Sequence, residues 1–102
     1  MSDKVVQVRD AIKEFAQAME RRARYGHKRV VAEEVMAAKF MSIKDMLEGA
    51  ERNGKQVWEF CRLAEDEGRA LSAAEKDQLL DAAADVANYL RMAVEKIRAA
   101  EA

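Results

Sequence analysis

Residues 79–90 read LLDAAADVANYL, and this stretch determines how the last third of the chain folds. It contains no Lys, Arg or Glu, and its polar side chains are Asp81, Asp85 and Asn88. A helix with one side in water normally carries long charged residues on that side. The stretch therefore predicts a helix whose polar side is covered by another helix, by a second subunit or by a ligand.

The spacing of apolar residues around this stretch predicts which face of the helix meets the core. On a helical wheel, six apolar side chains lie within about 80° of one another and form the expected core stripe. They are Leu79, Ala83, Val86, Leu90, Val94 and Ile97. Asp81, Asp85 and Asn88 lie on the opposite side, within about 60° of one another.

The composition of the whole chain is that of an all-α protein. The 102 residues are 50% hydrophobic and 36% charged and include no proline, as is typical of helical proteins rich in Ala, Glu, Lys, Leu and Arg. No stretch alternates apolar and polar residues as a strand would. A single domain of this length buries only about 65% of its unfolded surface, so we expect it to gain stability from self-association.

Net charge and cysteine content limit the expected partners and the expected cellular location of the protein. The formal charge of −1 gives no general argument for nucleic acid or membrane binding. Cys61 is the only cysteine, and the opening MSDKVVQVRD lacks the apolar core of a signal peptide. No run is long enough to span a bilayer. We expect a cytoplasmic protein with neither a membrane nor a nucleic acid as its partner.

Four glycines divide the chain into predicted helices at about 3–25, 29–48, 55–67 and 73–99. The glycines are Gly26, Gly49, Gly54 and Gly68. The first helix has apolar residues at alternating spacings of three and four. These residues are Val5, Val8, Ile12, Phe15 and Met19. The expected architecture is an antiparallel four-helix bundle that forms oligomers.

Two local signals set helix boundaries in this prediction. The segment GAERNG, residues 49–54, is expected to end the second helix because its two glycines permit left-handed backbone conformations. Ser72 and Glu75 fit a capping box, in which the serine hydroxyl and the glutamate carboxylate accept hydrogen bonds from unpaired backbone N–H groups. The last helix is therefore expected to begin directly after Ser72.

The acidic pair Asp81 and Asp85 needs a compensating partner. Two carboxylates one helical turn apart in a partly buried place repel each other and lose hydration. A divalent cation such as Mg²⁺ would neutralise them, and so would arginine. Alternatively, the two residues only mediate contacts between packed helices or face solvent.

A basic segment lies at the end of the first predicted helix. Residues 20–29 read ERRARYGHKR and place several cations around an expected turn at Tyr25 and Gly26. The planar fork of arginine suits phosphate oxygens, and a following helix N-terminus would add partial positive charge. The alternative is a solvated helix end. Contact with a nucleic-acid backbone would use the same groups, but the near-zero net charge and the lack of a recognisable reading helix argue against it.

Three segments resemble, in the same order, the phage-type branch of the all-α NTP pyrophosphohydrolase (MazG-like) superfamily. They are RRARYG at 21–26, AAKFMSIKDML at 37–47 and DAAADVANYLRM at 81–92. The resemblance covers about residues 20–95, and its sharpest element is the DVANY of residues 85–89. It implies an oligomeric helical bundle that uses Mg²⁺ to hydrolyse the α–β phosphoanhydride of a nucleoside triphosphate.

The resemblance also implies where the metal ligands would lie. Members of the superfamily hold the cation with an E-x-x-E pair and a later E-x-x-D pair. Asp85 matches the final aspartate, but Ala82 stands where the second pair has glutamate, which leaves Asp81 as the substitute. Glu33 and Glu34 lie in the earlier helix without a second glutamate at the required spacing.

These considerations predict a site with three kinds of residue. Asp81 and Asp85, with Glu33 or Glu34, would hold Mg²⁺, and Asp85 with Asn88 would be the catalytic residues. The phosphate-binding residues would be Arg21, Arg22, Arg24 and Lys28. Because the metal motif is incomplete, a nucleotide-binding protein without turnover stays open beside an active enzyme. The alternative function is a non-catalytic helical interaction protein, such as a phage accessory protein or an inhibitor of a host factor.

Overall fold

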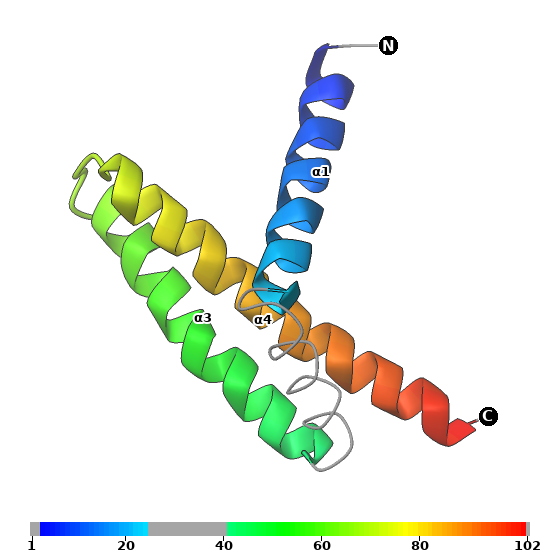
Figure 1. Ribbon diagram of the computed structural model, residues 1–102. Coiled ribbons are helices and arrows are strands. Elements are labelled where there is room, and N and C mark those ends of the chain that lie inside the picture. Colours follow the sequence, from blue (N-terminus) through cyan, green and yellow to red (C-terminus); the bar gives the residue numbers. More distant parts are fainter. Residues whose placement is uncertain (1–2, 25–40, 102) are drawn as a thin grey trace.

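The computed structural model describes residues 3–24 and 41–101 of the chain (Figure 1). This described part contains three helices and no strand, which confirms the all-α prediction. The helices are α1 (Asp3–Arg24), α3 (Ile43–Glu65) and α4 (Ala73–Glu101). Residues 29–40 of the predicted second helix lie outside the described residues.

Helix α4 is the central element. Helices α3 and α4 run antiparallel along each other, joined by a short loop in which Gly68 has a φ of 62°. The C-terminal end of α1 packs on the middle of α4, and the rest of α1 stands away from the α3–α4 pair (Figure 1). The N-terminal half of α1 is therefore a projecting helix.

Helix α3 begins and ends at positions that differ from the prediction. Ser42 is its N-cap: the Ser42 Oγ accepts from the Asp45 N–H at 3.1 Å, and the Ser42 N–H donates to Asp45 Oδ2 at 3.2 Å. This capping box starts a new helix at Ile43, so a helix that is continuous from 29 to 48 is wrong at residues 41–42.

The predicted break at residues 49–54 is also wrong, because α3 continues through both glycines. Gly49 is buried where the ring of Tyr89 on α4 comes close, and a Cβ at position 49 would lie 2.7 Å from Tyr89 Cε1. Gly49 thus serves the contact between two helices and does not end one. At Gly54 a Cβ would meet no atom within 4 Å.

The predicted capping box of the last helix is confirmed. The Glu75 N–H donates to Ser72 Oγ at 3.1 Å, and the Ser72 N–H donates to Glu75 Oε1 at 3.0 Å. Arg69 adds a bidentate ion pair to the same carboxylate, with Nη2 to Oε2 at 2.6 Å. Hydrogen bonds from Arg69, then from Ser72, lower the pKa of Glu75 to about 2.

The core between α3 and α4 is small. Met46 is the only large side chain that is fully buried in the described part of the chain. Met92 and Ala93 pack with it, and Met41, Ile43 and Tyr89 lie against this cluster. The Lys96 ammonium group also donates a hydrogen bond to the Met41 carbonyl, which ties the start of α3 to α4.

The predicted core stripe of α4 is wrong for its C-terminal half. Leu90, Val94 and Ile97 are 45%, 52% and 45% exposed, respectively. The opposite side of the helix carries small residues, and there Ala84 is fully buried and Asn88 is only 9% exposed. Small side chains let neighbouring helices approach, so α1 covers the side of α4 that carries the polar residues.

Candidate functional site

The aspartates of α4 meet the arginines of α1 where these two helices cross. Asp81 and Asp85 lie one turn apart on α4, and Arg21 and Arg22 lie in the last turn of α1. We call these four residues the arginine–aspartate cluster. The sequence predicted all four as site residues, and the fold brings them together.

Arg22 and Asp85 form the strongest contact of the cluster. Arg22 Nε donates to Asp85 Oδ1 at 3.0 Å, and Arg22 Nη2 donates to Asp85 Oδ2 at 2.9 Å. This fork-to-fork geometry is the strong form of an ion pair. Their side chains are 31% and 26% exposed, so solvent screens the pair only in part.

Asp81 has a looser environment. Arg21 Nη2 donates to Asp81 Oδ1 at 3.3 Å, and Arg22 Nη1 lies 3.9 Å from Asp81 Oδ2. The Arg21 side chain is 56% exposed and that of Asp81 is 37% exposed. Exposed pairs of this kind contribute little to stability.

Asn88 completes the contact between α1 and α4. Its Nδ2 group donates to the carbonyl oxygen of Met19 at 3.0 Å, and its Oδ1 accepts from Arg91 Nε at 3.3 Å. Both ends of the buried amide are thus hydrogen-bonded. The sequence predicted Asn88 as a residue that orients a ligand or water, but here it holds α1 against α4.

The charges of the cluster balance, because two guanidinium groups face two carboxylates.

A polar cavity of about 460 Å³ lies beside the cluster, and side chains from α1 and α4 line this cavity. These residues are Glu14, Gln17, Arg21, Asp77, Leu80 and Asp81. The sequence gives no local signal for Glu14, Gln17 or Asp77, since nothing in it shows that α1 crosses α4 at this point.

The donor set of the cluster does not fit a resident Mg²⁺ ion. Mg²⁺ requires several oxygen ligands in near-octahedral geometry, and both oxygens of Asp85 already accept from Arg22. Within residues 3–24 and 41–101 no three His, Cys, Asp or Glu side chains are arranged to hold a metal ion. Glu33 and Glu34, the other predicted ligands, lie outside the described residues.

Of the four predicted phosphate-binding residues, two lie in the cluster and two have side chains outside the described part of the chain. Arg21 and Arg22 lie in the cluster, whereas Lys28 and the side chain of Arg24 lie outside the described part. The two described arginines already have carboxylate partners. A phosphate group that binds them must therefore displace a carboxylate.

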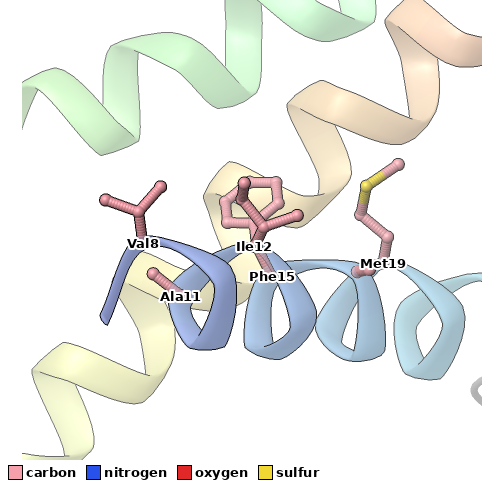
Figure 2. Close-up of a pocket in the computed structure, with 6 residues that line it drawn as sticks. Val8, Ala11, Ile12, Phe15 and Met19 are labelled. Atoms are coloured by element: carbon pink, nitrogen blue, oxygen red, sulfur yellow. The ribbon is translucent and has the colours of Figure 1, made fainter. Parts of the chain in front are cut away.

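A second surface feature runs along α1, from its projecting half to the region that packs on α4. An apolar groove of about 450 Å³ is lined there by side chains from successive turns of the helix. They are Val8, Ala11, Ile12, Phe15, Ala16 and Met19 (Figure 2). Val8 and Ile12 are 59% and 63% exposed.

Comparison of the chain with protein-family models, with curated proteins and with solved structures found no match. In the described residues, no helix has the length and apolar character needed to cross a membrane.

Proposed function

We propose that the arginine–aspartate cluster binds the phosphate groups of a nucleotide that arrives with its own Mg²⁺ ion. The chain would then be a MazG-like nucleotide-binding protein. The observation that carries the proposal is the convergence of Arg22 and Asp85, 63 positions apart, within one site. The sequence had assigned one of them to phosphate and the other to the cation on separate grounds.

The physical reason is charge balance. A bare phosphate group would gain the arginines but face two carboxylates, and a bare cation would gain the carboxylates but face two guanidinium groups. A nucleotide bound to Mg²⁺ carries both signs. It can exchange partners with the cluster so that every buried charge keeps an opposite charge beside it.

Two features of the site support such an exchange. Arg21 and Asp81 are the more exposed members of the cluster and border the polar cavity, so a ligand reaches them first. The sequence that follows the cluster arginines also contains charged residues of both signs, which are Arg24, Lys28, Glu33 and Glu34. The proposal places the protein in the cytoplasm, where nucleotides and Mg²⁺ occur together.

Calorimetric titration tests the proposal. The purified protein is titrated with a panel of nucleoside and deoxynucleoside triphosphates, in Mg²⁺ and again in EDTA, and with Mg²⁺ alone. We expect binding only when nucleotide and Mg²⁺ are both present. Release of pyrophosphate in the same samples would add hydrolysis of the triphosphate to the proposed function.

A matched variant controls for nonspecific arginine effects. Arg62 on α3 is paired with Glu59 and Glu67 and takes no part in the cluster, so Arg62→Gln should bind as the wild type does. Absence of binding by every nucleotide in Mg²⁺, or equal binding in EDTA, would remove the proposal.

The second candidate function is a helical interaction protein, such as a phage accessory protein that covers a host factor. The exposed apolar groove on α1 favours it, because large apolar patches on soluble proteins mark interaction surfaces. This candidate predicts no thermal shift from any nucleotide. Its binding would be lost when Phe15 or Ile12 is replaced by a charged residue.

A further inference from the structure

We propose that the apolar stripe of α1 is covered by the α1 helix of a second copy of this chain, with the two helices antiparallel. The stripe consists of Val5, Val8, Ile12, Phe15 and Met19. The inference is independent of nucleotide binding, because Val5, Val8 and Ile12 lie in the N-terminal half of α1, whereas the arginine–aspartate cluster lies at its C-terminal end.

The exposure of the stripe is the first reason. Val5, Val8 and Ile12 are 42%, 59% and 63% exposed, although they are among the most apolar residues of α1. Helix α1 meets α4 only near its C-terminal end, so α4 leaves the N-terminal half of the stripe open (Figure 1). Open apolar surface of this kind is stabilised when a partner removes it from water.

The segment between α1 and α3 is too short to cover the stripe with a helix. Val8 lies about 24 Å from Arg24 along the helix axis, at 1.5 Å per residue, so a chain that ran back to Val8 and returned would travel about 48 Å. Sixteen residues separate Arg24 from Met41. Even fully extended, they span only about 55 Å, which leaves no length for a helix along the stripe.

The exposed surface of the chain is large enough to accommodate an interface of standard size. The chain exposes 7744 Å². A compact monomer of 11.5 kDa would expose about 5,800 Å², and a protein in a standard interface buries about 800 Å². The radius of gyration is 15.7 Å, against about 13 Å for a compact domain of this length.

The spacing of the stripe indicates that the partner is another α1 helix. The residues follow one another at intervals of three and four, which is the heptad pattern of paired helices. A two-fold axis at Ile12 places Ile12 against its own copy. It also places Val5 against Met19, and Val8 against Ala16 and the neighbouring Phe15, so that each valine meets a larger side chain of the partner helix.

The antiparallel arrangement follows from these volumes. A parallel pair would place valine against valine and phenylalanine against phenylalanine, and its layers would then differ in width. The antiparallel pair gives layers of similar volume, which helices pack more evenly. Ala11 and Ala16 beside the stripe let the two backbones approach.

The experiment measures the molar mass of the full chain by light scattering after gel filtration. We expect a dimer for the wild type and a monomer for Ile12→Glu, because two carboxylates would face each other at the axis. Gln7→Glu adds the same charge to an exposed position of α1 away from the stripe and should remain a dimer. A monomeric wild type would overturn the proposal and direct attention to a different partner protein.

Disulfide trapping tests the direction of the helices without relying on the Ile12→Glu variant to fold. In a Cys61→Ser background, which removes the exposed native thiol, Ile12→Cys should form a covalent dimer on mild oxidation. Val5→Cys should not, because Val5 faces Met19 in the antiparallel pair. Efficient trapping through Val5→Cys, or none through Ile12→Cys, would contradict the antiparallel arrangement.

Discussion

Arg22 and Asp85 join α1 to α4 through two parallel hydrogen bonds of 3.0 and 2.9 Å. This pair is the most buried ion pair among those described, and Asn88 supports it by its bond to the Met19 carbonyl. Without these contacts, α1 would have few ties to the α3–α4 pair. The cluster therefore fixes the C-terminal end of α1 on the middle of α4.

The first prediction concerns the contribution of this ion pair to the free energy of unfolding. A double-mutant cycle with Arg22→Ala and Asp85→Ala should give a coupling free energy of about 1 kcal/mol in urea unfolding, because the pair is bidentate and partly shielded. The same cycle on Lys55 and Glu51, which lie 3.9 Å apart and are mostly exposed, should give a value near zero. Equal coupling in both cycles would show that the cluster does not hold α1.

The second prediction concerns the glycines of α3. Gly49→Ala should lower the free energy of unfolding by about 1–3 kcal/mol, because the new methyl group would meet the Tyr89 ring at 2.7 Å. Gly54→Ala should raise it by about 0.5–1 kcal/mol, since the helix gains a better residue and the space is open. Thermal unfolding of both variants measures the contrast. Two substitutions with the same sign would disprove the close approach.

The third prediction concerns pH. The pKa of Glu75 is lowered from 4.5 to about 2 in the folded protein, chiefly by Arg69. Its stabilising contribution is therefore present above the unfolded pKa and is lost as the pH falls through the folded pKa. The stability difference between wild type and Glu75→Gln should be constant above about pH 5 and should shrink between pH 4 and pH 2. A difference that stays unchanged across this range would refute the ion pair.

The fourth prediction concerns the sign of the cluster's charge. Asp81→Asn leaves one positive charge in excess, so this variant should bind nucleotide in EDTA, a condition in which the wild type is expected not to bind it. Arg21→Gln leaves a negative charge in excess and should improve binding of Mg²⁺ alone. Calorimetry measures both. If neither variant changes its ion preference, the cluster is a structural contact only.

Several features of this protein follow from local sequence. The capping box at Ser72 and Glu75 starts α4 where the sequence predicts, because a cap depends on residues three positions apart. The need of Asp81 and Asp85 for a partner outside their helix is also met. The sequence left a cation and arginine open as that partner, and the fold supplies arginine.

Other features depend on contacts between distant segments. Gly49 has the appearance of a helix end in the sequence, and only the position of Tyr89 shows that it lies inside a helix and makes room for a ring. In the same way, Ser42 and Asp45 form a cap that the periodicity of the preceding residues hides.

The sequence by itself determined that the chain is helical, where α4 begins, and which side chains need partners, because these depend on neighbours within one or two turns. The tertiary structure decided which face of α4 is buried. Periodicity identifies an apolar face but not the helix that will cover it, and small residues such as Ala84 allowed α1 to approach the polar side. Leu90 and Val94 were left at the surface as a result.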